Sequence, residues 1–244
     1  MKTKMFNRLL ASLTLTVAAA VPAQAGPIID FDVGLDTSQS PFAPLLTHTD
    51  RMTQGDFFID MYSTKASAAL FDLVGALVDG TDSLGACSGI ICPANGTQFL
   101  AALNDGLPDI GRLDGGYFRM QSFDASFIAA FGNVIPPVAL LLRVEGYDGN
   151  TLAFIQDFQL AGPVRGGYSF STFALSSLNA TRDVTEIAFR GFACNAAGSC
   201  SRSLDQAQFA LDNIAFVPEP GSIALLGLGL AGLAVMRRRR APQN

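Results

Sequence analysis

Short runs of alternating apolar and polar residues, separated by Gly- and Asp-containing turns, limit this chain to β structure. In VALLLRVEGY (residues 138–147) the apolar side chains at even positions share one face, and Arg143 and Glu145 share the other. A period of two is typical of a half-buried strand. The turn DGN and a second run, TLAFIQDF, follow directly. Together they predict a β-hairpin.

Similar runs recur along residues 26–216. In TEIAFRGF (185–192), Ile187 and Phe189 face opposite to Glu186 and Arg190. Further predicted strands are IIDFDV (28–33), DFFIDMY (56–62), GYFRMQSF (116–123), GYSFSTFAL (167–175) and AQFALDNIAF (207–216). SAALFDLVGALV (67–78) is compatible with one helix or with a pair of strands. Strands at this density, with such turns, predict an all-β fold, an antiparallel β-sandwich or jelly roll.

In the last predicted strand, residues 207–216, the alternation of apolar and polar side chains is interrupted. Its apolar positions switch parity between Leu211 and Ile214. A one-residue offset of this kind predicts a β-bulge around Asp212 and Asn213.

Residues 1–25 contain the features of a secretory signal peptide in the expected order. Lys2, Lys4 and Arg8 precede the apolar run 9–21, and the small-residue triplet AQA ends at Ala25. Such a triplet fits the cleavage site of an export signal. We therefore expect cleavage after Ala25 and export.

The tail, residues 217–244, contains a proline pair, a short apolar run and an arginine block. Pro218, Glu219 and Pro220 cannot continue a helix, because proline lacks the amide donor. The uncharged run 222–236 is predicted to form a short transmembrane helix, although it falls short of the about 20 residues that usually span a bilayer. The block Arg237, Arg238, Arg239 and Arg240 favours the cytoplasmic side. The body of the protein is therefore expected outside, with an extended segment next to the membrane.

VPEPGS, the Leu/Gly/Ala run and RRRR, in this order, resemble the PEP-CTERM sorting signal of Gram-negative bacteria. The resemblance implies recognition by an exosortase, a membrane cysteine protease that cuts near Pro-Glu-Pro. It also implies transfer to the cell envelope, outer surface or extracellular matrix, with only transient membrane contact of the tail. A permanently anchored envelope protein is the alternative.

Gln208, Phe209 and Asp212 resemble the Q-F-x-x-D group of PEP-CTERM proteins. That resemblance implies a jelly-roll body akin to galactose-binding-like modules, and GYFRMQSFDASFI is similar to a strand of such proteins.

The length and charge of residues 26–216, between the two signals, limit the number of domains and the class of partner. Gly26 to Phe216 is long enough for one domain with its own core. It has twenty acidic and nine basic side chains, a net charge near −11. Nucleic acid is therefore not an expected partner, because phosphate binding requires the opposite charge.

The four cysteines form two close pairs, Cys87 with Cys92 and Cys194 with Cys200. In an exported chain the leading interpretation is one disulfide within each pair. A four-cysteine zinc site is the alternative, although both spacings exceed the usual two-residue knuckle.

No catalytic constellation stands out. His48 is the single histidine, so any Ser/His/Asp or Cys/His mechanism would depend on it. GACSG (85–89) has the pattern of a nucleophile elbow, but Cys92 and Pro93 follow where a helix should begin. A pair of carboxylates that hydrolyses glycosides stays an alternative, because the sequence does not give the distance between two carboxyl groups.

Aspartates in glycine-rich segments make calcium the expected metal, if any is bound. One candidate site is Asp105, Asp109 and Asp114 in a single loop. The other joins Asp30 or Asp32 to Asp212, because jelly rolls often bring the first and last strands together. Ordinary turn-capping aspartates are the alternative in both cases.

The sequence thus predicts an exported, non-enzymatic β-sandwich. Its expected partners are the export machinery and an exosortase, and extracellular polysaccharide is a further candidate. A secreted hydrolase on the same scaffold is the alternative function.

Overall fold

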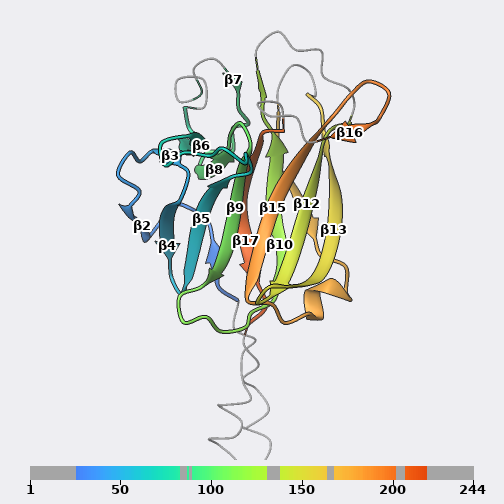
Figure 1. Ribbon diagram of the computed structural model, residues 1–244. Helices are drawn as coiled ribbons and strands as arrows, with labels where there is room; N and C mark the ends of the chain where they lie inside the picture. The colour runs from blue at the N-terminus through green and yellow to red at the C-terminus, as the bar shows by residue number, and fades with distance from the viewer. Residues whose placement is uncertain are drawn as a thin grey trace, which may run out of the picture.

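The computed structural model describes residues 26–82, 87, 90–130, 138–163, 168–201 and 207–218. These residues form two antiparallel β-sheets stacked face to face (Figure 1). They include no α-helix, and a short 3-10 turn, η2 (Asn179–Thr181), lies near the lower end. The predicted all-β antiparallel sandwich is confirmed.

The eight-stranded sheet faces the viewer in Figure 1. Its strands follow the order β13 (Thr151–Ala161), β12 (Val138–Asp148), β15 (Glu186–Cys194), β9 (Gly106–Arg112), β5 (Phe57–Ser63), β4 (Asp50–Gln54) and β2 (Leu35–Gln39), with β16 (Cys200–Ser201) beside β15.

The seven-stranded sheet lies behind it. Its order is β14 (Ser171–Ala174), β10 (Met120–Phe127), β17 (Phe209–Phe216), β8 (Gln98–Ala102), β6 (Leu73–Asp79) and β3 (Leu45–Thr47), with β1 (Ile28–Ile29) beside β17. A separate ribbon pairs β7 (Ile90–Ile91) with β11 (Ala129–Ala130).

The main core lies between the two sheets, as the alternation predicts. Leu140, Leu142 and Val144 of β12 are fully buried, and β12 and β13 form the predicted hairpin. Phe123 of the rear sheet packs edge-on against Phe189 of the front sheet, with ring centroids 5.2 Å apart. Each fully buried aliphatic or aromatic side chain of this kind stabilises the fold by about 1.5–3 kcal/mol.

The bulge predicted in the last strand is present in β17. Asp124 pairs with Asp212 and Ser122 with Ala215, so β17 has one residue more than β10 over this stretch. Asn213 takes a left-handed backbone, φ 48°, which Asn tolerates better than most residues.

Three local predictions need correction. Residues 73–79 of SAALFDLVGALV form strand β6, so the helix alternative is wrong. The IIDFDV strand ends at Ile29, because Phe31 takes φ 59° and turns its ring into the core. The predicted loop 104–116 contains strand β9, which pairs with β5 on one side and β15 on the other.

Candidate functional site

The two sheets differ in what covers their outer faces. Behind the seven-stranded sheet, a second apolar cluster packs Val78, Phe99 and Ile128 against segments that include Cys87 and Phe170. The outer face of the eight-stranded sheet presents mainly polar and aromatic side chains instead. We call this surface, centred on β5, β9, β15 and β12, the polar face.

Strand register arranges the side chains of the polar face in rows that run across the strands. Arg51 lies opposite Asp60, and Asp60 opposite Asp109. The same row continues through Ala188 of β15 to Glu145 of β12. Directly opposed residues on one face have Cβ atoms about 4.5–5.5 Å apart, so this row is a continuous surface across five strands.

A neighbouring row contains a ring, a glycine and a carboxylate. Phe58 lies opposite Gly111, and Gly111 opposite Glu186, which in turn lies opposite Tyr147. A methyl group added at Gly111 would overlap the Phe58 ring. The glycine therefore lets the ring lie flat across β9.

One end of the polar face is organised around Asp60. Both carboxylate oxygens accept hydrogen bonds from the Arg51 guanidinium, each at 2.6 Å, and Tyr62 donates its hydroxyl at 3.1 Å. The guanidinium also lies 4.2 Å from the Phe58 ring centroid. His48 packs edge-on against Tyr62, and its Nδ1 accepts the amide of Ser63. The single histidine is thus half-buried, with its ring held between Tyr62 and the Ser63 amide.

The other end is organised around Glu145. Tyr147 donates its hydroxyl to the carboxylate at 2.8 Å, and Arg190 lies 3.3 Å from the same oxygen. Beyond them Arg143 forms a bidentate pair with Asp157 and lies 5.0 Å from the Phe192 ring centroid. The two ends therefore repeat one chemistry, in which a carboxylate holds an arginine and a tyrosine in place.

Asp109, between these two ends, lacks such compensation. Its Oδ1 is buried without a hydrogen-bond partner among the described residues. Burial, together with the nearby carboxylates of Glu186 and Asp60, raises the pKa of Asp109 to about 7. Burial also raises the pKa of Tyr62, to about 12, with Asp60 adding to the effect. The centre of the polar face therefore holds a carboxyl group that takes up a proton near neutral pH.

The predicted loop site of Asp105, Asp109 and Asp114 is not assembled. Asp105 precedes β9 and accepts hydrogen bonds from Ser63 and the Lys65 amide. Asp109 lies within β9, whereas Asp114 beyond the strand pairs with Arg112. The strand separates the three carboxylates, and no group of three metal-ligating side chains occurs in the described part of the chain.

The alternative pair, Asp32 and Asp212, is brought close by the fold. β1 pairs with β17, so the first and last strands are neighbours as predicted. Asp212 is buried, and its carboxylate accepts hydrogen bonds from Asn95, Thr97 and the Asn213 amide. Burial raises the pKa of Asp212 to about 6, and the Asp32 carboxylate adds to the effect. Asp30 instead accepts from Gln54.

Asp32 and Asp212 provide two carboxylates, and Asn95 and Thr97 add an amide and a hydroxyl oxygen nearby. Calcium usually takes about six to eight oxygen ligands, so a calcium site here stays a prediction. Millimolar calcium is expected to raise the melting temperature by about 2–4 °C, which corresponds to about 1 kcal/mol for a domain of this size, and magnesium less. Asp212→Asn should abolish the rise, whereas Asp114→Asn should leave it. Equal melting temperatures in calcium and in chelator, measured by differential scanning calorimetry, would contradict the prediction.

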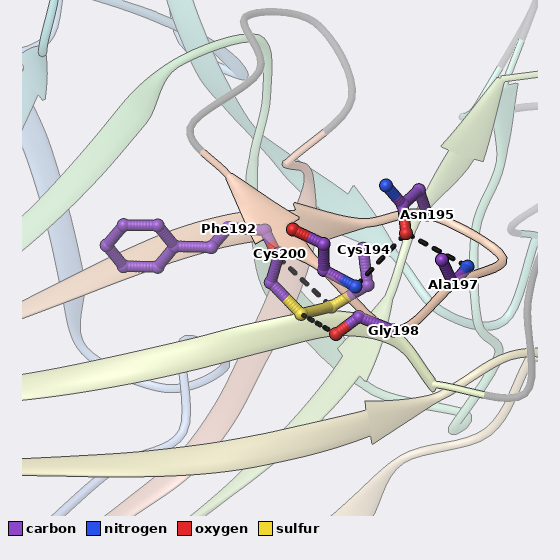
Figure 2. Close-up of a disulfide and its surroundings, with 7 residues drawn as sticks. Phe192, Cys194, Asn195, Ala197, Gly198 and Cys200 are labelled. Atoms are coloured by element: carbon purple, nitrogen blue, oxygen red, sulfur yellow. Dashed lines mark hydrogen bonds between the residues drawn. A yellow bond between two sulfur atoms is a disulfide. The ribbon is translucent and has the colours of Figure 1, made fainter.

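Both cysteine pairs form disulfides, as the leading interpretation predicts, and the zinc alternative is therefore wrong. Cys87 bonds to Cys92, and Cys194 to Cys200, with S–S distances of 2.03 and 2.02 Å. Figure 2 shows the second disulfide joining β15 to β16 across a hairpin. Within that hairpin the Asn195 side chain accepts the amides of Ala197 and Ser199, each at 3.0 Å.

The two disulfides indicate an oxidising, extracytoplasmic environment. The profile of the PEP-CTERM protein-sorting motif matches residues 216–240, which include Pro218, Glu219, Pro220 and the four arginines. The chain carries a PEP-CTERM sorting signal. This signal and the disulfides together indicate an exported protein that is sorted by an exosortase.

The predicted signal peptide and the apolar run 222–236 lie outside the described residues. Within the residues that are described, no helix is long and apolar enough to cross a membrane. Of the Q-F-x-x-D group, Phe209 lies in the main core and Asp212 beside the bulge.

Solved structures with loosely similar arrangements exist. A DUF4465 family protein from Bacteroides ovatus has a TM-score of 0.41 at 10% identity, covering 75% of this chain and 92% of that protein. The CBM22-2 xylan-binding domain of Paenibacillus barcinonensis Xyn10C has a TM-score of 0.36 at 10% identity, with 79% and 99% covered. CBM27-1 of Caldicellulosiruptor saccharolyticus, in complex with mannohexaose, has a TM-score of 0.34 at 12% identity, with 80% and 98% covered. TM-scores this low carry no inference about the present chain. No curated protein matches the sequence.

Proposed function

We propose that the domain is a non-catalytic polysaccharide-binding module, which an exosortase delivers to the cell surface or extracellular matrix of a Gram-negative bacterium. The polar face is the proposed ligand surface. The observation that carries the proposal is its repeated pairing of carboxylate, arginine and tyrosine beside Phe rings. This combination is suited to sugars, whose hydroxyls need both donors and acceptors and whose C–H faces pack on rings.

Prior ordering of the side chains supports the proposal. Arg51 and Tyr62 are fixed by Asp60, and Tyr147 by Glu145, so little side-chain entropy remains to be lost when a ligand binds. A tyrosine that donates its proton to a carboxylate still has lone pairs that accept from a sugar hydroxyl. Two of the four tyrosines of the chain are used in this way.

The excess of carboxylates bears on which polysaccharides are suitable ligands. Asp60, Asp109, Glu145, Glu186 and Asp157 outnumber Arg51, Arg143 and Arg190 on the polar face, and the whole domain is acidic. Like charges repel, so uronate-rich or sulfated polymers are unfavourable ligands. Neutral polysaccharides are the favoured class.

Phe58→Ala and Glu186→Gln are expected to weaken binding of neutral polysaccharides at least tenfold, because the first removes the ring and the second a charge-assisted acceptor. Affinity electrophoresis of the purified protein against glucan, xylan and mannan measures this effect. Thr172→Ala, on the opposite sheet, is the matched control and should bind like wild type. No retardation of wild type by any of the three polymers would count against the proposal.

A hydrolase is the second candidate, because one observation favours it. Asp60 accepts two hydrogen bonds from the Arg51 guanidinium through its carboxylate, whereas the adjacent Asp109, with its pKa raised to about 7, takes up a proton near neutral pH. A carboxylate beside a protonated carboxyl group can act as base and acid. Release of reducing ends from a bound polymer, abolished by Asp109→Asn while binding is retained, would establish this function instead.

A further inference from the structure

Within the described part of the chain, the two sheets of the sandwich have four edges, and one edge is much longer than the others. The front sheet ends at β2 and β13, and the rear sheet at β3 and β14. Strands β2, β3 and β14 have five, three and four residues, whereas β13 has eleven. An edge strand presents unpaired N–H and C=O groups, and short length is one way in which proteins protect it. The β13 edge, at the right of Figure 1, lacks this protection.

The hydrogen bonds of β12 establish which backbone groups of β13 are free. Tyr147 lies on β12, and its carbonyl accepts the Thr185 amide on the β15 side. The register of β12 against β15 is unbroken over 140–147, so the backbone groups of successive residues point alternately to the two neighbouring strands. Those of Val144 and Leu142 therefore point away from β15 and bond to β13.

The partners of these two residues in the hairpin are Gln156 and Phe158, whose backbone groups are thus used in the β12–β13 ladder. Ile155, Asp157 and Gln159 alternate with them and direct their N–H and C=O groups outward. Among the described residues, no backbone hydrogen bond reaches these three from outside the hairpin. The β13 edge therefore offers a row of unused donors and acceptors.

The side chains of β13 favour contact with another strand. Ile155 is 44% exposed and Leu152 46%. The strand contains neither proline nor lysine, which commonly protect long edges. Its one charged residue, Asp157, already forms a bidentate pair with Arg143. A second strand along this edge would meet no proline and no unpaired charge of β13.

The inner side of β13 is fixed to the rest of the domain. The Gln156 side-chain oxygen accepts the Ser176 amide and the Asn179 side chain, each at 2.9 Å. The Phe158 ring packs edge-on against Phe123, with centroids 5.2 Å apart. The strand is thus held extended before a partner arrives, which lowers the entropy lost on pairing.

We propose that two copies of this chain pair antiparallel through β13, about a twofold axis perpendicular to the front sheet. Pairing of one strand with its own copy uses the same surface twice, so the assembly closes at two copies. The other three edges are too short to extend it. Both front sheets join into one, with both polar faces on the same side. The dimer does not depend on the proposed function, but one polysaccharide reaching both polar faces would bind with avidity.

Sedimentation equilibrium of the exported protein, purified from a bacterium that expresses the full chain, is expected to give twice the mass of one chain. Amide hydrogen exchange of Ile155, Asp157 and Gln159 should slow as protein concentration rises, because these amides gain acceptors only in the dimer. The amides of Gln156 and Phe158 should be protected at every concentration. A single-chain mass up to about 1 mM protein, or a dimer in which the three outward amides stay unprotected, would overturn the inference.

Ile155→Pro combined with Gln159→Pro removes two outward donors from each copy. Proline is tolerated at an edge position whose N–H is unused in the ladder, so the fold should persist while the dissociation constant of the dimer rises at least tenfold. Ile155→Thr with Gln159→Thr is the matched control, because it keeps both amides, and it should stay dimeric. Undiminished dimerisation of a folded proline variant, or loss of the dimer in both variants, would contradict pairing through the backbone. The exchange measurement on wild type needs no variant and decides the matter if the proline variant does not fold.

Discussion

Replacing Pro218, Glu219 and Pro220 by alanine is expected to leave the protein exported but to reduce C-terminal processing at least tenfold. Proline lacks the amide donor that a helix requires, whereas alanine has the highest helix propensity. Three alanines would allow the helix predicted from the apolar run to extend toward Val217, and the extended segment that a protease can bind would be lost. The predicted N-terminal signal is separate in sequence, so its cleavage should continue.

Intact-mass spectrometry of envelope and medium fractions measures both cleavages in this variant. Pro242→Ala is the matched control, because it changes a proline of the same tail outside the motif and should be processed like wild type. Release of the triple alanine variant at the wild-type rate would contradict exosortase sorting through Pro-Glu-Pro.

Asp109→Asn is expected to stabilise the protein by about 2–4 kcal/mol at pH 8 and to flatten its dependence of stability on pH. Burial, with Glu186 and Asp60 nearby, raises the pKa of Asp109 from 3.8 to about 7 in the folded protein. The folded state thus binds the proton more tightly than the unfolded state. The resulting stability is fully present below pH 3.8 and is lost as the pH rises through 7. A tenfold change in proton affinity corresponds to about 1.4 kcal/mol, so this rise in pKa sets an upper limit of about 4 kcal/mol.

Urea unfolding between pH 5 and pH 8 measures this effect. Wild type is expected to lose stability over this range, while Asp109→Asn keeps a small residual slope from Asp212, whose pKa is also raised, to about 6. Asp114→Asn is the matched control, because its pairing with Arg112 lowers the pKa of Asp114 to about 2, outside the range measured. An unchanged slope in Asp109→Asn would show that this carboxyl group is not desolvated.

The polar face connects stability with the proposed function. The buried Oδ1 of Asp109 has no hydrogen-bond partner among the described residues, which destabilises the folded protein when this carboxyl group is charged. A hydroxyl of a bound sugar could supply the missing donor to Asp109. If polysaccharide binds there, its affinity should change with pH through the same proton that governs the unfolding experiment.

Local patterns predicted those parts of the fold whose signal is complete within a few residues. The β12–β13 hairpin follows from strict alternation and a Gly-containing turn, and the β17 bulge from a switch of parity at Asp212 and Asn213. Both disulfides follow from cysteines close in sequence. By contrast, Gly106, Pro108 and Gly111 are turn-forming residues, so the sequence predicts a loop where strand β9 lies. Pairing with β5 and β15 outweighs these propensities.

The sequence by itself determined the sorting signal and the class of fold, since both are written in consecutive residues: prolines, an apolar run and arginines in one case, and alternation at period two in the other. Only the tertiary structure decided that Arg51, Asp60, Asp109 and Glu145 share one row, because strand order and register depend on contacts between distant segments. It also separated Asp109 from Asp105 and Asp114 and placed Gly26 against Pro218. Burial and the proximity of Glu186 and Asp60, which set the pKa of Asp109, arise only when β5, β9 and β15 pair in one sheet.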